Sequence, residues 1–202
     1  MVKQLNKYNI ILFDFDGVIV DSDNIRINAF RKTLKKYDDV YVDQFIEYHN
    51  KNGGISRYVK FEYFKNLTGA SNEELDKWLL IYSQHCFQMM SDKNILIGEI
   101  INLISSLNNL KKELFVVSAS DQNELRKLLG IYSLTKCFKF IYGSPVSKTN
   151  NISNLLKKFK YDPNETVLIG DSINDYEAAI ENKISFLGFG NEFIKKYTKL
   201  SL

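Results

Sequence analysis

Five short, largely apolar runs constrain the fold of this 202-residue chain more than any other feature. They cover residues 10–13, 114–117, 138–142, 166–169 and 184–187. Runs that do not alternate with polar residues are typical of strands that are covered on both faces. The segments between the last four runs space their apolar residues as helices do. This alternation of strands and helices predicts the α/β class, with a doubly wound, Rossmann-like parallel sheet.

Residues 21–94 interrupt the alternation, because they contain no convincing strand and several helical patterns. The last pattern begins with a capping box, Ser71 with Glu74, and continues as an apolar stripe as far as Met90. We therefore predict an α/β core domain of residues 1–20 and 95–202 and an inserted small all-helical domain of residues 21–94, with hinges near residues 21–23 and 91–96. An insert after the first strand would lie over the carboxyl ends of the strands, where open α/β sheets bind ligands, and would act as a lid.

The composition excludes several classes of function. Basic residues outnumber acidic residues by only 27 to 24, and the charges are dispersed, so we expect no nucleic-acid partner. The first apolar run has four residues, too few for a signal-peptide core or a membrane span, so we expect a cytoplasmic protein with no membrane partner. Cys86 and Cys137 lie far apart and predict neither a zinc site nor a redox motif.

Polar side chains stand where the predicted strands end. Asp14 and Asp16 follow the first apolar run, Ser118 follows the second, and Asp171 follows the fourth. Because side chains alternate along an extended chain, Asp14 and Asp16 point the same way, and two neighbouring carboxylates need a cation or a shared proton. A magnesium ion would satisfy them, and a site of this kind suits phosphoryl transfer. Lys148 stands just before another helical segment.

Four motifs in order, DFDGV, VVSAS, SPVSK and IGDSINDYEAA, span nearly the whole chain. Together they resemble the haloacid dehalogenase superfamily, and within it the branch of phosphoglycolate phosphatases and β-phosphoglucomutases that carries a helical cap. The resemblance implies a Mg²⁺-dependent phosphatase that hydrolyses a small phosphomonoester, such as a sugar phosphate or phosphoglycolate, through an aspartyl-phosphate intermediate. The expected partner is a small phosphorylated metabolite, and the expected assembly is a monomer or a weak homodimer.

The chemistry assigns a role to each acidic residue. A phosphate ester repels nucleophiles, so its hydrolysis needs a positioned nucleophile, charge neutralisation and a proton for the leaving oxygen. Asp14 is the candidate nucleophile, and Asp16 is the candidate acid that protonates the leaving oxygen and then the base that activates water. Asp171 would share Mg²⁺ with Asp14, and the resemblance implies that Asp16 adds its backbone carbonyl. Asp175 would orient a metal-bound water or hold Lys148, whose charge offsets those of Asp14 and the phosphate; alternatively, Asp175 only stabilises a helix N-terminus.

Three further residues are expected to bind the substrate. Ser118 and the backbone amide of Ala119, at a predicted helix start, would donate hydrogen bonds to the phosphoryl group. Arg57 follows the paired glycines Gly53 and Gly54 and would reach from the lid to a second anionic or hydroxyl-rich part of the substrate. The alternative for this segment is a turn with a solvated arginine.

Other functions stay open at this point. A phosphomutase similar to β-phosphoglucomutase would share all four motifs and the arginine of the insert, but those mutases commonly carry a histidine where this chain has Arg26. A non-catalytic binding module of the same fold is a second alternative, against which the complete set of motif residues argues. A dehalogenase is disfavoured, since carbon–halogen displacement needs neither the metal nor Asp16. We expect His49 and His85 to be packing or surface residues outside the site.

Overall fold

All five apolar runs contribute to one parallel sheet in the computed structural model, which describes residues 1–190 and 192–200. The strands are β1 (Ile10–Phe13), β2 (Glu113–Asp121), β3 (Phe140–Ser144), β4 (Thr166–Gly170) and β5 (Ser185–Gly188). Their order in the sheet is β3-β2-β1-β4-β5, and every neighbouring pair is parallel. The predicted α/β class is thereby confirmed.

The central position of β1 brings the polar ends of three strands together. Phe13, the last residue of β1, pairs with Val116 of β2 and with Ile169 of β4. Asp14 therefore lies beside the segments that carry Ser118 and Asp171. Because parallel strands all end at the same edge of a sheet, the side chains that follow them converge there.

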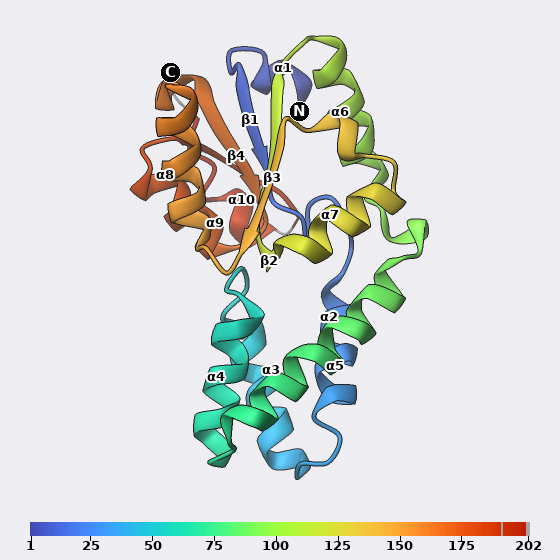
Figure 1. Ribbon diagram of the computed structural model, residues 1–202. Coiled ribbons are helices and arrows are strands. Elements are labelled where there is room, and N and C mark those ends of the chain that lie inside the picture. The colour runs from blue at the N-terminus through green and yellow to red at the C-terminus, as the bar shows by residue number, and fades with distance from the viewer. Residues whose placement is uncertain (191, 201–202) are drawn as a thin grey trace.

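Helices cover both faces of the sheet, which explains why its strands are largely apolar (Figure 1). Ile11 and Phe13 pack in one core cluster with residues of α1 (Val2–Leu5), α6 (Gly98–Asn109) and α7 (Gln122–Ile131). Ile10 and Leu12 pack in a second cluster with residues of α8 (Lys148–Phe159), α9 (Ile173–Glu181) and α10 (Glu192–Lys195). Short 3₁₀ helices span Lys93–Ile95, Thr135–Cys137 and Pro163–Glu165. None of the described helices is long and apolar enough to cross a membrane.

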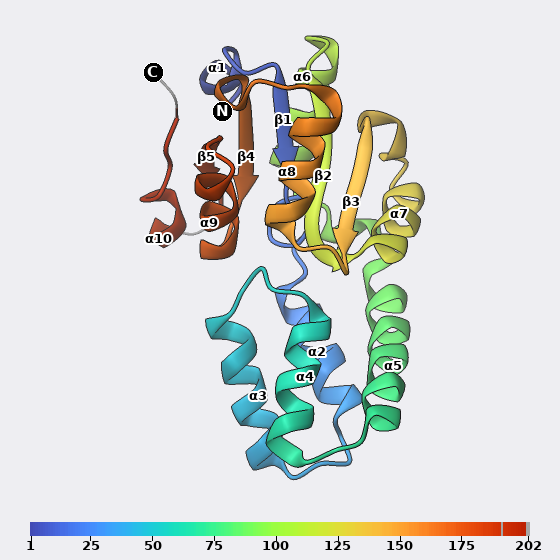
Figure 2. The same ribbon diagram turned by 60° about the vertical axis from the view of Figure 1, so that its left-hand side comes forward.

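Residues 23–90 form four helices beyond the carboxyl ends of the strands (Figure 2). They are α2 (Asp23–Thr33), α3 (Asp39–Lys51), α4 (Arg57–Thr68) and α5 (Asn72–Met90). Aromatic side chains fill the space between them: the ring centroid of Phe30 lies 4.2 Å from that of Tyr82 and 5.3 Å from that of Phe61. The predicted capping box of Ser71 and Glu74 is present at the start of α5. The helical character expected for this segment is therefore observed.

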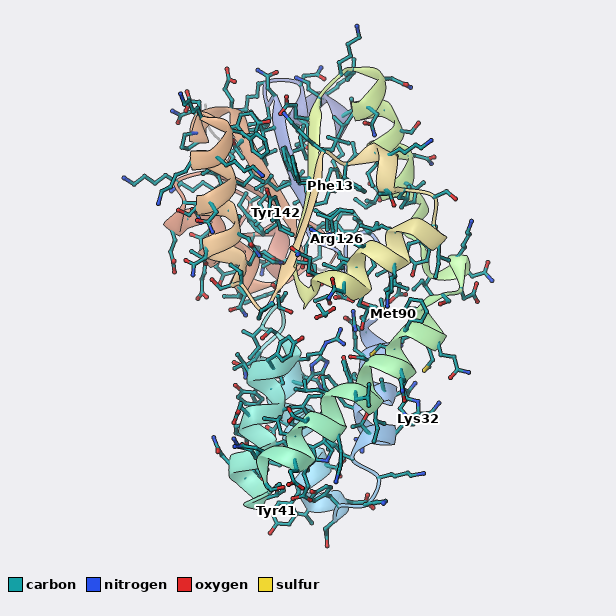
Figure 3. All side chains as sticks on the ribbon, viewed as in Figure 1. Phe13, Lys32, Tyr41, Met90, Arg126 and Tyr142 are labelled. Carbon is teal, nitrogen blue, oxygen red and sulfur yellow. The ribbon has the colours of Figure 1, made fainter. Side chains whose placement is uncertain are left out.

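The chain passes between the sheet and these four helices through two adjacent segments. The backbone amide of Asp21 donates a hydrogen bond to the carbonyl oxygen of Ile95 at 2.8 Å, and Val20 forms an isolated β-bridge with Leu96. Met90, at the end of α5, lies where the two parts of the molecule meet (Figure 3), and the Tyr132 hydroxyl donates to its carbonyl oxygen. The two segments lie at or beside residues 21–23 and 91–96, and their role as hinges stays a prediction. The division into two domains at residues 21–94 stays a prediction.

Candidate active site

A cavity of about 400 Å³ lies between the carboxyl edge of the sheet and the helical insert. Its size is within the range of small-molecule sites, roughly 300–1,000 Å³. Side chains of both parts line it, among them Asp14, Asp16, Arg26, Phe30, His49, Gly54, Arg57, Lys60, Tyr82, Ser118, Ala119, Asp171 and Asn174. The cavity therefore contains most of the residues that the sequence indicated as candidates for chemistry.

Asp14 is buried at the end of β1 and pairs with Lys148. The Lys148 Nζ lies 2.9 Å from the Asp14 Oδ2 atom, and the Phe15 amide donates to Asp14 Oδ1 at 2.7 Å. Lys148 also contacts the Oδ1 atom of Asp175, which is fully buried. Burial alone would lower the pKa of Lys148, but the charges of Asp14 and Asp175 raise it above its ordinary value. Lys148 is therefore a fixed positive charge beside Asp14, held in place by Asp175.

Asp175 itself is immobilised at the start of α9. Its Oδ2 atom accepts hydrogen bonds from the Asp171 amide and the Ser172 amide, each at 3.1 Å, and from the Ser172 hydroxyl at 2.8 Å. Both readings of Asp175 from the sequence thus apply, since it caps the helix and also holds Lys148. Both oxygens of the Asp175 carboxylate thus have hydrogen-bond or ion-pair partners within the protein.

Asp14, Asp171 and Asp175 form an acidic cluster in which one oxygen of each lies within 4.8 Å of the others. In the part of the chain that the structure describes, the Asp171 carboxylate has neither a hydrogen-bond donor nor an ion-pair partner. Burial, together with the charges of Asp14 and Asp175, raises the pKa of Asp171 above its ordinary value. Burial likewise raises the pKa of Asp14, and Asp175 adds to this effect. Carboxylates crowded in this way fit a divalent cation, which prefers oxygen ligands.

Asp16 is held by four hydrogen bonds. Ser22 and Ser120 each donate a hydroxyl at 2.5 Å, and Arg26 donates Nε at 3.1 Å and Nη2 at 3.2 Å. Burial would raise the pKa of Asp16, but the Arg26 charge and these hydrogen bonds lower it to about 2. The expected acid role needs Asp16 protonated and Asp14 ionised. The structure shows the reverse of this requirement: the Arg26 charge lowers the pKa of Asp16, whereas burial raises the pKa of Asp14.

Ser118 and Ala119 line the cavity, but the predicted helix start at this point is wrong. β2 continues through Ser118 to Asp121, and α7 begins only at Gln122, with the Asp121 carboxylate as its N-cap. The Ser118 hydroxyl is buried and accepts a hydrogen bond from the Ser120 amide at 3.2 Å. Hydrogen bonds to a phosphoryl group would therefore come from the end of a strand, without help from a helix dipole.

Arg57 does reach beyond the insert, to helix α7, but its charge is already neutralised there. Its Nη1 and Nη2 atoms each donate to Glu124 of α7 at 2.8 Å, and Nη1 also donates to Ser83 at 2.8 Å. Arg26 donates to the same Glu124 at 2.9 Å and so links it to Asp16. The alternative of a solvated arginine is wrong, since Arg57 is 5% exposed. No pattern along the chain indicates Glu124, which lies 67 residues from its partner Arg57.

The paired glycines of the insert pack closely against the start of α9. Gly54 has a φ of +78°, and a Cβ atom there would collide with the Ser172 hydroxyl and approach Asn174. The Asn174 side-chain amide also donates to the carbonyl oxygen of Gly53. The close approach that the glycines permit is therefore to the α9 end of the site. Gly53, Gly54, Ser172 and Asn174 all line the cavity.

His49 lines the cavity, so the expectation that it lies outside the site is wrong. Its Nδ1 atom lies 2.7 Å from the Nζ of Lys60, which is also a cavity residue and is 5% exposed. His85 is absent from the residues that line this cavity, as expected. Lys60 lies three residues after Arg57 on α4, a spacing that places both on one side of the helix. That spacing is the signal from which Lys60 could have been found.

Comparisons with known proteins agree with this arrangement. A family model described as haloacid dehalogenase-like hydrolase matches residues 11–189. A phosphoglycolate phosphatase of Colwellia psychrerythraea is 23% identical over an alignment of 197 positions that covers 92% of this chain and 85% of that protein. A phosphoglycolate phosphatase of Aquifex aeolicus is 26% identical over an alignment of 176 positions that covers 84% of this chain and 78% of that protein. The solved structure of β-phosphoglucomutase from Clostridium difficile has a TM-score of 0.77 at 19% identity and covers 96% of this chain and 90% of its own, a likeness of fold.

Proposed function

The chain belongs to the haloacid dehalogenase-like hydrolase family, and from this we propose that it is a Mg²⁺-dependent phosphatase that hydrolyses a small phosphomonoester through an aspartyl-phosphate intermediate. The family match and the two phosphatase relatives support a phosphatase enzyme. The observation that carries the proposal is the convergence of Asp14, Lys148, Ser118 and Asp171 at one edge of the sheet. Sugar phosphates and phosphoglycolate-like esters fit a cavity of this size.

Asp14 would act as the nucleophile. Its carboxylate attacks phosphorus, the bond from phosphorus to the ester oxygen breaks, and an acyl phosphate forms on Asp14. Lys148 offsets the repulsion between this carboxylate and the incoming phosphate, and Ser118 with the Ala119 amide would bind the transferring group. Water then attacks the phosphorus atom, which releases phosphate and restores Asp14.

Asp14 and Asp171 are the side chains that would hold Mg²⁺, with the backbone carbonyl of Asp16 as a further ligand. The crowded, unpaired carboxylate of Asp171 supports this assignment. When bound, the ion neutralises charge on the non-bridging oxygens of the phosphoryl group. Asp175 would contribute indirectly, because it positions both Lys148 and the Asp171 backbone.

Asp16 would give a proton to the leaving oxygen and later take one from the attacking water. The hydrogen bonds from Arg26 keep it ionised in the structure, so its acid form requires that these bonds break. Arg26 lies on α2, which directly follows the hinge at residues 21–23. We therefore propose that the insert of residues 21–94 moves as a lid, and that its movement withdraws Arg26 and lets Asp16 be protonated.

A phosphomutase is the second candidate, and Arg26 argues against it. Position 26 commonly holds a histidine in the β-phosphoglucomutases that this chain resembles, whereas here an arginine is engaged by Asp16 and Glu124. An arginine cannot exchange protons near neutral pH. The cytoplasmic location and the monomeric or weakly dimeric state stay predictions.

The test measures phosphate release by purified protein with and without Mg²⁺, first on p-nitrophenyl phosphate and then on a panel of metabolite phosphates. Asp14→Asn should abolish release, while the exposed control Asp76→Asn should keep it. Incubation with hexose 1-phosphates and a trace of bisphosphate covers the alternative. Isomerisation without net hydrolysis would favour the mutase, and equal inertness of wild type and Asp14→Asn would favour a binding module.

A further inference from the structure

Lys60 is a buried cation of the cavity whose charge is unpaired. It lies on α4, is 5% exposed and lines the cavity between the sheet and the insert. Its nearest polar neighbour is a neutral group, the Nδ1 atom of His49 at 2.7 Å. Across residues 1–190 and 192–200, the structure gives Lys60 no carboxylate within ion-pair distance. A buried ammonium group without a counter-ion is unfavourable unless a ligand supplies the missing charge.

The other buried cations of the site differ from Lys60 in this respect. Lys148 pairs with Asp14 and Asp175, Arg26 pairs with Asp16 and Glu124, and Arg57 pairs with Glu124. These cations are balanced before any ligand enters. The charges of Asp16 and Asp23 act on Lys60 only from beyond ion-pair distance, and burial lowers the pKa of Lys60 to about 8. At neutral pH most Lys60 side chains therefore carry a positive charge.

His49 adds a hydrogen-bond donor to this charge. Because its Nδ1 atom accepts a hydrogen bond from Lys60, the neutral ring carries its hydrogen on Nε2. Burial and the nearby charges of Lys60 and Arg26 lower the pKa of His49 to about 3, so the ring is neutral near pH 7. The ring of Phe30 packs edge-on against it, with the centroids 5.0 Å apart, and fixes its orientation. Lys60 and His49, which both line the cavity, together thus supply one positive charge and N–H donors.

We propose that Lys60 and His49 form a second anion subsite, which binds a carboxylate of the substrate while its phosphate lies against Asp14. The natural substrate is then a phosphomonoester that also carries a carboxylate, as in the phosphate esters of hydroxy acids and sugar acids. A carboxylate matches the site better than a second phosphate, since one lysine balances a single negative charge and Asp16 and Asp23 oppose a second. This inference rests on the proposed phosphatase function and specifies its substrate class.

The test compares esters that differ only in the carboxylate. Suitable pairs are 2-phosphoglycolate with 2-hydroxyethyl phosphate, 3-phosphoglycerate with glycerol 3-phosphate, and 6-phosphogluconate with sorbitol 6-phosphate. For wild type, the ratio of kcat/KM for the acid to kcat/KM for its alcohol partner should exceed 10 in at least one pair, and Lys60→Met should reduce that ratio on the order of 10- to 100-fold. Lys60→Arg, which keeps the charge, should retain most of the ratio. Lys65→Met removes a half-buried lysine of the same helix that does not line the cavity, and it should leave the ratio unchanged.

A binding experiment separates this inference from the phosphatase proposal. Calorimetry on Asp14→Asn protein measures the affinity for the same pairs of intact esters, so it needs no turnover. An acid preference that Lys60→Met removes would support the subsite even if wild type hydrolysed nothing. Equal affinity for acid and alcohol in every pair, or a preference that survives in folded Lys60→Met protein, would overturn the subsite and leave the phosphatase proposal standing. Circular dichroism of each variant establishes that it is folded.

Discussion

Replacement of Glu124 by glutamine tests whether the buried ion-pair network holds the insert against the sheet. Glu124 is 7% exposed and neutralises two guanidinium groups, at 2.8 Å from Arg57 and 2.9 Å from Arg26. Glutamine has nearly the same shape but no charge. Because Arg57 donates to both Glu124 oxygens, the NH2 group of glutamine would face a donor of Arg57 in either orientation. Arg26 would keep the charge of Asp16. Arg57 would lose its ion-pair partner and would contact only neutral groups, among them the Ser83 hydroxyl and the Tyr82 ring, whose centroid lies 4.9 Å away.

The expected loss follows from this asymmetry. Removing one partner of a buried ion pair costs about 3–5 kcal/mol, because the remaining charge is left uncompensated in a low-dielectric region. We therefore expect Glu124→Gln to lower the free energy of unfolding by about 3–5 kcal/mol. Glu47→Gln removes the partner of Lys51 in an exposed pair on α3 and serves as the control. Its effect should be far smaller, since exposed ion pairs contribute little.

Urea unfolding measures the effect, with two signals that report different parts of the molecule. Trp78, the single tryptophan of the chain, is buried in α5, so its fluorescence reports the insert. Far-ultraviolet circular dichroism reports all helices. For Glu124→Gln, the fluorescence transition should move to lower urea concentration at least as far as the circular dichroism transition. A loss below about 1 kcal/mol by both signals, with an unchanged slope, would refute the idea that this network bears the charge of two arginines.

Three further predictions concern the acidic cluster, the loss of stability at low pH and the paired glycines. Asp171→Asn should remove most of the rise in Tm that Mg²⁺ produces. In wild type, the rise should be larger at pH 8 than at pH 5, because the raised pKa of Asp171 makes protons compete with the ion for this carboxylate. The lowered pKa of Asp16 contributes about 2 kcal/mol to the stability of wild type above pH 3.8, and this contribution is lost as the pH falls to about 2. Asp16→Asn should lack it, as unfolding measured across this pH range would show. Gly54→Ala should lower kcat/KM, whereas Gly69→Ala, at φ +68° with open space around it, should cost about 1–2 kcal/mol of stability and leave kcat/KM unchanged.

Much of the fold and of the site could be predicted from sequence, because the relevant signals are local. An apolar run such as Ile10–Phe13 fixes a strand covered on both faces, and a carboxylate directly after it, Asp14, must lie at the sheet edge. The same reasoning located Asp171, whereas the role expected of Lys148 came from the resemblance of the SPVSK motif to the family. The helix start expected near Ser118 was wrong, because β2 extends further than its apolar run and local spacing does not show where a strand stops pairing.

Tertiary structure decided which charges meet. Arg26, Arg57 and Glu124 come from α2, α4 and α7, and Arg26 lies 98 residues from Glu124, so no pattern along the chain joins them. The same holds for Lys60 and His49, whose contact depends on how α3 and α4 pack. Sequence by itself therefore determined which polar residues follow the strands and which groups are available for chemistry. Folding determined which of these groups are neutralised and which keep a free charge, since ion pairing and burial depend on distances between elements that local spacing does not set.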